Sequence, residues 1–260
     1  MLPLSRWPEA DRRGIAGVFT DIDDTLTTEG AITPDALAAL ASLRAAGVEV
    51  IAITGRPVGW SEPFAREWPV AAIVAENGAV ALAGGRKLYT QDAATRAANF
   101  ARMQAVAARI VREVPGATLA QDSPGRETDI AVDHSEFTHL PPAQIERVVA
   151  LMRSEGMNAT VSSIHVNGWF GEHTKLTGAR WIVRELFGRA LDDEIGRWAY
   201  VGDSTNDVLM FERFAHSIGV ANIRSFEAQL SHPPRYVTDG ERGAGFAEVA
   251  RAVVQARLKP

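Results

Sequence analysis

The segment DIDDT at residues 21–25 contains three aspartates and directly follows the apolar run IAGVFT at residues 15–20. An apolar run that stops abruptly at polar residues is typical of a buried parallel strand and its carboxyl end. Because side chains alternate along an extended chain, Asp21 and Asp23 should face one side and Asp24 the other. Two neighbouring carboxylates can have different roles in one reaction, since one can attack as a nucleophile while the other transfers a proton.

A second acidic turn, GDSTND at residues 202–207, follows another apolar stretch and contains Asp203 and Asp207. Carboxylate oxygens are ligands that Mg²⁺ favours, together with water and phosphate. Either acidic segment alone could be an ordinary turn or the capped start of a helix. Buried acids are costly unless a cation or hydrogen bonds hold them. Two such turns without a basic cluster beside them therefore predict a bound cation.

Two further residues could bind a phosphate group. Thr54 lies in the segment TGRP at residues 54–57, after a third apolar run at residues 48–53. Its hydroxyl and the nearby backbone N–H groups, Gly55 included, form a donor set for phosphate oxygens. Lys175 would open a helix and could neutralise both phosphate and carboxylate charge. Taken singly, a Thr in a strand-to-turn connection and a solvated surface Lys are also common.

The elements that would position these residues alternate between strands and helices. Thr33 and Pro34 start a helix, since Thr can cap it and Pro suits its first position, and Gly47 ends it. The other elements of this pattern are predicted as strands at residues 48–53, 70–74, 198–201, 217–220 and 236–237, and as helices at residues 176–187 and 245–258. The alternation predicts an α/β fold, a Rossmann-like doubly wound parallel sheet whose carboxyl edge binds ligands.

The middle of the chain follows a different order. A helix is predicted at residues 91–113 and another after the two prolines at 141 and 142, with strand-like runs at residues 117–121, 128–133, 159–163 and 165–170. Strands that come in pairs around helices predict an antiparallel sheet in an α+β unit. We therefore expect a core formed by residues 1–83 and 172–260, with residues 84–171 inserted as a separate cap.

Composition narrows the functional classes. The chain has no cysteine, which excludes disulfides, thiolate metal sites and thiol nucleophiles. A net charge of −5 argues against nucleic-acid binding, which needs a basic surface. The sequence offers neither a signal-peptide-like start nor an apolar stretch approaching the roughly 20 residues of a membrane helix. We expect a cytoplasmic enzyme with no membrane partner.

In order and form these segments resemble the motifs of the haloacid dehalogenase superfamily of phosphatases. Its DxDx[TV], strand-end Thr or Ser, Lys and GDxxxD motifs match DIDDT, Thr54, Lys175 and GDSTND. The insert between the second and third motifs resembles the Cof-like branch, which contains sucrose-phosphate, mannosyl-phosphoglycerate and phosphomannose enzymes. The segment ENGA at residues 76–79 is also similar to that branch. The cap matches in position rather than in residues, and Asp24 stands where many members have Gly.

The resemblance implies a magnesium-dependent phosphatase that works through an aspartyl-phosphate. Asp21 would be the nucleophile, and Asp23 would protonate the leaving oxygen and then deprotonate the attacking water. Mg²⁺ would be held by the Asp21 carboxylate, the Asp23 backbone carbonyl and Asp203. Asp207 would be either a further ligand or a residue that contacts the ligands without touching the ion. Thr54 and Lys175 would hold the phosphate oxygens during transfer.

The substrate is expected to be a small phosphorylated metabolite, and the family analogy favours a sugar phosphate. Cap closure over the site would exclude water. Candidate contacts with phosphate or substrate, besides Thr54 and Lys175, are Gly55, Arg56, Asn77, Arg126, Trp169, His173 and Asn206. Trp169 could stack on a sugar face or be an ordinary core residue, and Arg126 could clamp an anion or be solvated.

Other functions stay open from the sequence. A phosphotransferase or sugar phosphomutase would pass the same phosphoryl group to a hydroxyl. More remote alternatives are a signalling receiver module, which has no large insert, and a silent sugar-phosphate-binding protein. A dinucleotide-binding enzyme would need a Gly-rich turn where the acids of residues 21–25 stand. The protein is expected to be a monomer or a homodimer.

Overall fold

Asp21, Thr54 and Asp203 directly follow strands of one large sheet. In the computed structural model, which describes residues 1–258, its order is β1-β15-β14-β13-β2-β5-β6-β7-β8. The strands are β1 (Leu2–Pro3), β15 (Tyr236–Val237), β14 (His216–Gly219), β13 (Trp198–Gly202), β2 (Gly17–Thr20), β5 (Glu49–Ile53), β6 (Ala72–Ala75), β7 (Val80–Ala83) and β8 (Arg86–Tyr89). In this order, each strand from β1 to β6 pairs in parallel with its neighbour. Strand β7 pairs antiparallel with β6, and β8 pairs antiparallel with β7. The predicted α/β fold is confirmed.

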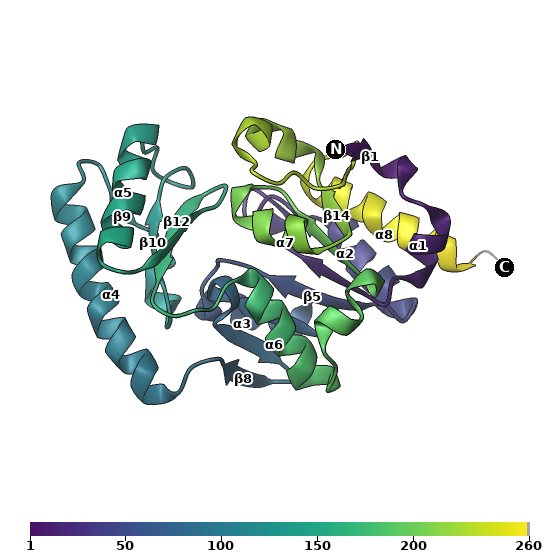
Figure 1. The fold of residues 1–260 in the computed structure, drawn as a ribbon, viewed down its shortest axis with the longest axis horizontal. Coiled ribbons are helices and arrows are strands. Elements are labelled where there is room, and N and C mark those ends of the chain that lie inside the picture. The colour runs from purple at the N-terminus through teal and green to yellow at the C-terminus, as the bar shows by residue number, and fades with distance from the viewer. Residues whose placement is uncertain (259–260) are drawn as a thin grey trace.

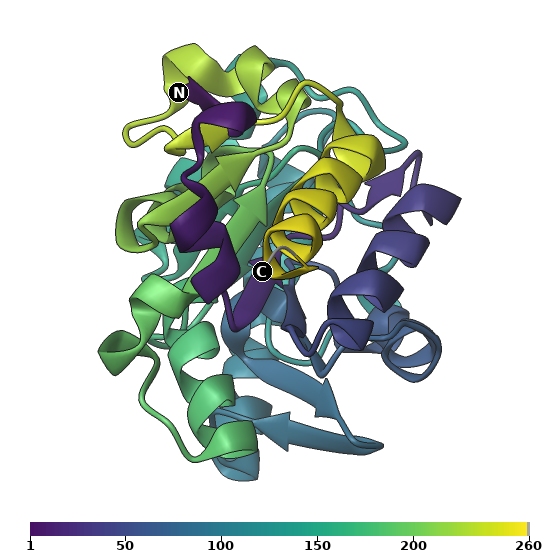
Figure 2. The same ribbon diagram turned by 90° about the vertical axis from the view of Figure 1, so that its right-hand side faces the viewer.

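Helices cover both faces of this sheet (Figure 2). They are α1 (Glu9–Gly14), α2 (Pro34–Ala45), α3 (Val58–Glu67), α6 (Lys175–Phe187), α7 (Val208–Arg213) and α8 (Arg242–Leu258). Val18 packs in the cluster that contains residues of α2 and α8, and Phe19 packs in the cluster of α6 and α7. This alternation buries both faces of β2 and explains why the strand is apolar throughout.

Local signals fixed the ends of the helices that border the site. The Thr33 side chain accepts a hydrogen bond from the Ala36 backbone, with Pro34 in the first turn. The Thr174 side chain caps α6 and forms a reciprocal capping box with Thr177, so that Lys175 is the first residue of the helix. Helix α3 was not predicted, and a proline lies inside it.

A smaller body rises beside the core (Figure 1). Its antiparallel sheet has the order β11-β12-β10-β9. The elements are α4 (Ala93–Glu113), β9 (Thr118–Leu119), β10 (Ile130–Asp133), α5 (Pro142–Ser154), β11 (Asn158–Val161) and β12 (His165–Trp169). Both helices pack on one face through an apolar cluster of their own. This is the antiparallel insert that the sequence predicted.

The core sheet continues beyond Ala83, where the insert was predicted to begin. Residues Arg86–Tyr89 pair with β7 as the last strand of the core sheet. A short hairpin of β3 (Thr27–Thr28) and β4 (Ala31–Ile32) follows the first acidic segment. No helix within residues 1–258 is both long enough and apolar enough to cross a membrane.

Candidate active site

The predicted site residues meet at the carboxyl edge of three adjacent parallel strands. Asp21 follows β2, Asp203 follows β13 on one side of it, and Thr54 follows β5 on the other. Carboxylate oxygens of Asp21, Asp203 and Asp207 lie within 4.8 Å of one another, and all three residues are buried. The sheet thus brings together acids that are about 180 residues apart in the chain.

Lys175 bridges two of these acids. Its Nζ donates to Asp21 Oδ1 at 2.6 Å and to Asp207 Oδ1 at 2.7 Å. Burial alone would lower the pKa of Lys175, but the two carboxylates outweigh it and raise that pKa. The ammonium group therefore stays charged at neutral pH, as expected of a group that neutralises carboxylate and phosphate charge.

One ammonium group does not balance the whole cluster. The pKa of Asp21 is raised to about 7, mainly by burial and also by the neighbouring Asp207 and Asp23, against the opposing pull of Lys175. The pKa of Asp203 is raised well above its usual range by burial and by the neighbouring acids. Asp203 Oδ1 is buried and has no hydrogen-bond partner. An unpartnered carboxylate oxygen among buried acids fits a divalent cation with oxygen ligands.

Asp207 is already fully engaged. Its Oδ1 accepts from Lys175 and from the Tyr200 hydroxyl at 2.5 Å, and its Oδ2 accepts from the backbone N–H groups of Asp203 and Ser204. Two oxygens that accept four donors have little capacity left for a cation. The geometry suits the second predicted role, in which Asp207 orients Lys175 and the Asp203 turn from just beyond the cation.

Two residues of the site were missed in the sequence. Tyr200 lies in β13 and reaches Asp207 from within the core. Asn222 follows β14, the next strand of the same edge, and its Nδ2 donates to the Asp24 carbonyl at 3.0 Å and to Asp203 Oδ2 at 3.3 Å. The position of Asn222 after a strand end was the signal available for it, whereas a Tyr inside an apolar strand carries none.

Thr54 and Gly55 form a tight loop under the insert, which we call the cap. The Thr54 hydroxyl accepts the Arg56 backbone N–H at 3.0 Å. The Gly55 carbonyl accepts from Arg126 at 3.0 Å and from Asn167 at 3.2 Å. A Cβ on Gly55 would lie 3.2 Å from Asn167 Oδ1, so a side chain there would press against the cap. The loop is thus held from above by residues of β12 and of the connection before β10.

Asp23 and Asp24 leave the strand in different directions. Asp23 pairs with Arg56, whose guanidinium lies 2.9 Å from Asp23 Oδ1. Asp24 has a left-handed backbone with φ of 53° and pairs with Arg242 at 3.0 Å. Asp24 therefore turns toward the last helix and away from Lys175, as the alternation predicted.

Arg126 is neither a free anion clamp nor a solvated turn residue. Its side chain is 2% exposed and its guanidinium donates to Asp122, Asp129 and the Gly55 carbonyl. The solvated alternative was wrong because the turn that carries Arg126 packs against the core, where Glu76 accepts hydrogen bonds from the Thr128 backbone and hydroxyl. Arg126 serves the docking of the cap.

A cavity of about 310 Å³ opens beside Lys175 between core and cap. Asn77, Lys175 and Asn206 line it from the core, and Arg153, Thr160 and Trp169 line it from the cap. The Trp169 ring is buried, and its Nε1 donates to the His173 carbonyl at 2.9 Å. His173 stacks on that ring and does not line the cavity. The predicted contacts Asn77, Asn206 and Trp169 are thus gathered around one space.

Without divalent cations, Asp21→Asn is expected to become increasingly stable relative to the wild type as the pH rises from 5 to 8. The raised pKa of Asp21 means that the folded protein holds a proton that the unfolded chain has released, so the wild type loses stability in this window. Urea unfolding in EDTA should show the difference in unfolding free energy grow by about 1–3 kcal/mol. A difference that is constant with pH would contradict this assignment of charge.

The comparisons with known proteins agree with this geometry. Residues 18–107 match the family of haloacid dehalogenase-like hydrolases. None of the curated proteins matches the sequence. Many solved structures share the fold at low identity. A Thermoplasma acidophilum protein is 16% identical with a TM-score of 0.72, and the match covers 93% of this chain and 99% of that one.

Two structures with described activities share the same fold. A sucrose-phosphatase from Synechocystis sp. PCC6803, in complex with sucrose and phosphate, is 15% identical, with a TM-score of 0.67 over 94% of this chain and 98% of that one. A sugar phosphatase of haloacid dehalogenase subclass IIB is 15% identical, with a TM-score of 0.61 over 91% and 96%. Both matches include the cap as well as the core.

Proposed function

We propose that this chain, whose residues 18–107 match the haloacid dehalogenase-like hydrolases and which carries an inserted cap, is a magnesium-dependent phosphatase acting on a small sugar phosphate. The observation that carries the proposal is the convergence of Asp21, Lys175 and the unpartnered oxygen of Asp203 beside a cavity between core and cap. Transfer of a dianionic phosphoryl group requires a carboxylate that attacks, here Asp21, and a positive side chain, here Lys175. It also requires a free oxygen ligand for a metal ion, here on Asp203.

The proposed reaction has two displacements. Asp21 Oδ attacks phosphorus, the bond to the leaving oxygen breaks, and Asp23 gives that oxygen a proton. Asp23 then takes a proton from water as the water attacks the aspartyl-phosphate, which frees phosphate and restores Asp21. Lys175 and Thr54 hold the phosphate oxygens while their charge redistributes.

Asp21, Asp203 and the Asp23 backbone carbonyl would hold the cation. When bound, Mg²⁺ neutralises negative charge between the carboxylate and the phosphate. Asp207 keeps Lys175 and the Asp203 turn in place through the four hydrogen bonds that it accepts.

The lining of the cavity supports a polyhydroxylated leaving group. Asn77 Nδ2 and Thr160 Oγ1 are buried and lack hydrogen-bond partners, so each can bond a substrate hydroxyl. Trp169 also lines the cavity, while its ring is buried and stacked on His173. Arg153 adds a positive charge at the cap side. Unmade hydrogen bonds in the cavity wall suit a sugar better than a purely apolar alcohol.

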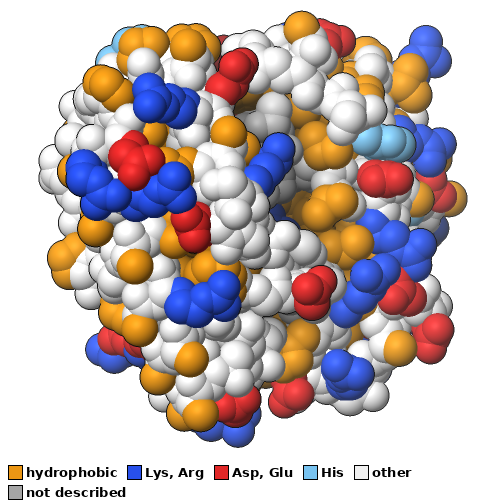
Figure 3. Space-filling view, turned by 60° about the vertical axis from the view of Figure 1, so that its left-hand side comes forward, with side chains coloured by type: hydrophobic (Ala, Val, Ile, Leu, Met, Phe, Trp, Pro, Cys, Tyr) orange, Lys and Arg blue, Asp and Glu red, His pale blue; other side chains and the backbone are white. Residues whose placement is uncertain are grey.

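A nucleic-acid substrate is not supported. On the face drawn in Figure 3, Lys and Arg side chains are interspersed with Asp and Glu. Together with the net charge of −5, this mixed surface lacks the basic stripe that would hold a phosphate backbone.

The function is tested by measuring phosphate release from p-nitrophenyl phosphate and from a panel of sugar phosphates. Release is expected with Mg²⁺ and should disappear in EDTA, because the buried acids then lack their counter-charge. Asp21→Asn serves as the inactive control. A folded protein that releases no phosphate from any compound, or that isomerises a sugar bisphosphate instead, would overturn the proposal.

Thr160→Val is expected to raise the KM for the preferred sugar phosphate about fivefold to tenfold, because one hydrogen bond to a substrate hydroxyl is lost. The KM for p-nitrophenyl phosphate, which has no hydroxyls on its ring, should change less than twofold. Thr118→Val is the matched control, since Thr118 is an exposed cap residue bonded to Thr138. Equal changes for both substrates would show that Thr160 does not contact the leaving group.

A further inference from the structure

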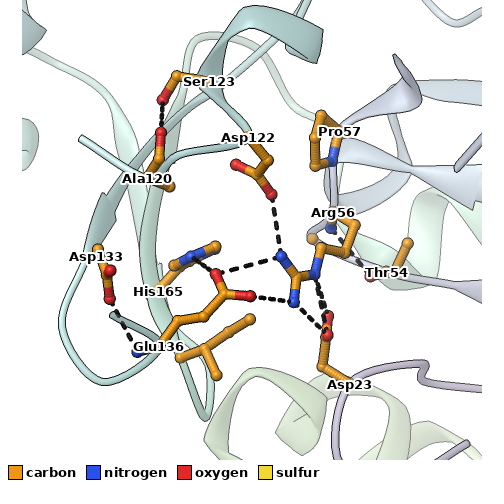
Figure 4. A network of polar contacts seen from close by, with 12 residues as sticks. Asp23, Thr54, Arg56, Pro57, Ala120, Asp122, Ser123, Asp133, Glu136 and His165 are labelled. Atoms are coloured by element: carbon orange, nitrogen blue, oxygen red, sulfur yellow. Dashed lines mark hydrogen bonds and ion pairs between the residues drawn. The ribbon is translucent and has the colours of Figure 1, made fainter. Parts of the chain in front are cut away.

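One guanidinium group joins the proposed proton-transfer residue to the cap. Arg56 Nε donates to both oxygens of Asp23, at 2.9 and 3.0 Å (Figure 4). Its Nη1 donates to Asp122 at 3.2 Å and its Nη2 to Glu136 at 2.7 Å. Arg56 and Asp23 belong to the core, whereas Asp122 and Glu136 belong to the cap. The Arg56 side chain is 5% exposed and stacks against Trp60.

The two cap carboxylates are themselves held in place. Asp122 accepts from Arg126, and Glu136 Oε2 lies 2.8 Å from His165 Nε2. Burial alone would raise the pKa of Glu136, but the neighbouring His165 and Arg56 outweigh it and lower that pKa to about 2. Arg56 therefore meets two fixed negative charges on the cap side.

We propose that Arg56 is a positioning residue that makes the orientation of Asp23 depend on closure of the cap. The planar guanidinium can bond all three carboxylates at once only when the cap lies where the structure has it. Movement of the cap would withdraw two of the three anions and leave the guanidinium free to turn. Arg56 would keep Asp23 as a partner but lose the orientation that Asp122 and Glu136 give its guanidinium, so the Asp23 carboxylate would no longer be held in one orientation. The proposal rests on the proposed function, in which Asp23 handles the proton.

Arg56 does more than hold the cap against the core. The cap has other contacts with the core that do not involve Arg56, including those of Arg126 and Asn167 with the Gly55 carbonyl and of Thr128 with Glu76. These contacts suffice to dock the part of the cap that lies over Gly55 and Glu76. Arg56 adds a bond to the one carboxylate that must move a proton. The consequence is that the Asp23 carboxylate is held in one orientation when the cap covers the site and is free to turn when water has access.

The proposal is tested on the cap side, where the altered residue does not touch the reacting atoms. Glu136→Gln keeps the shape of the side chain but weakens its hold on Arg56. We expect kcat/KM for a sugar phosphate to fall at least tenfold and kcat/KM for p-nitrophenyl phosphate to fall less than threefold, because kcat/KM reports on formation of the aspartyl-phosphate and not on its hydrolysis, in which Asp23 serves both substrates alike. An alkoxide leaving group needs a proton from Asp23, whereas p-nitrophenolate leaves without one. Glu155→Gln is the control, since Glu155 pairs with Arg109 within the cap.

Two results would overturn the proposal. The first is an equal loss for both substrates, which would indicate a structural effect of Glu136. The second is an additive loss when Glu136→Gln is combined with Asp23→Asn. If Glu136 acts through Arg56 on Asp23, it should have almost no effect once Asp23 cannot transfer a proton.

A measurement without catalysis separates this proposal from the proposed function. The chain has no cysteine, so fluorophores can be placed at Glu67→Cys in the core and Ser154→Cys in the cap, both exposed positions. Arg56→Gln is expected to lower energy transfer between them, because the cap opens more often. Unchanged transfer would overturn the coupling even in an active phosphatase. Absent phosphate release with changed transfer would instead overturn the proposed reaction.

Discussion

Asp21→Asn is expected to lower kcat by about 10⁴-fold or more while the protein stays folded. The amide is isosteric with the carboxylate but is a far weaker nucleophile, and losses of this order follow the removal of a covalent nucleophile. Phosphate release from the best sugar phosphate with saturating Mg²⁺ measures the effect. Asp24→Asn is the matched control, because Asp24 pairs with Arg242 outside the acidic cluster, and it should stay within about threefold of the wild type.

A covalent test accompanies this kinetic one. Acid-quenched wild-type protein should carry a phosphoryl group on the peptide that contains Asp21, detectable by mass spectrometry during turnover. The Asn variant should carry none. Residual activity above about 1%, or a phosphoryl group on another residue, would remove Asp21 from the role of nucleophile.

Lys175→Met is expected to abolish measurable turnover and to destabilise the fold by about 3–5 kcal/mol at pH 8 in EDTA. The structure gives the reason, since Lys175 is the group that bonds both Asp21 and Asp207 in the buried cluster. Without it, two neighbouring carboxylates face each other without compensation. Protonation removes that repulsion, so the loss of stability should shrink as the pH falls from 8 to 5.

Urea unfolding at both pH values measures this effect. Lys87→Met is the control, because Lys87 forms ion pairs with Glu62 and Glu127 in which all three side chains are partly exposed, and such pairs contribute at most about 1 kcal/mol. Mg²⁺ should restore part of the stability of the Lys175 variant at pH 8 through the same acids. An equal loss at pH 5 and pH 8 would mean that Lys175 stabilises the protein by packing and not by charge.

The cap contacts the active site on two sides, one at Arg56 and the other at Lys175, and the polar groups on the two sides differ. On the Arg56 side, the guanidinium bonds carboxylates of both core and cap, and a cavity of about 340 Å³ lies beside Asp23, Arg56 and Glu136. On the Lys175 side, the cavity of about 310 Å³ is lined by Asn77 and Thr160, which carry unpartnered polar atoms. This asymmetry assigns proton transfer to one side and recognition of the leaving group to the other. Variants on the two sides should therefore separate into effects on kcat and effects on KM.

The sequence by itself determined the elements whose signals are local. An apolar run followed by acids marks a buried strand and its end, so Asp21, Thr54 and Asp203 could be placed at one sheet edge before any coordinates were known. Lys175 could likewise be placed at the start of a helix. Alternation of strands with helices, broken by a stretch of paired strands, was sufficient to predict the inserted cap.

Only the tertiary structure decided how the polar groups pair. Lys175 meets Asp21 across 154 residues, and Arg56 meets Glu136 across 80, and no periodic pattern encodes such partners. Saturation of the Asp207 oxygens depends on Tyr200, which reads in the sequence as one more apolar strand residue. Charged groups bond whatever the folded chain brings within reach, and the docking of the cap determined that for Arg56. The sequence therefore indicated which residues carry the chemistry, and the packing of the two bodies determined what each of them contacts.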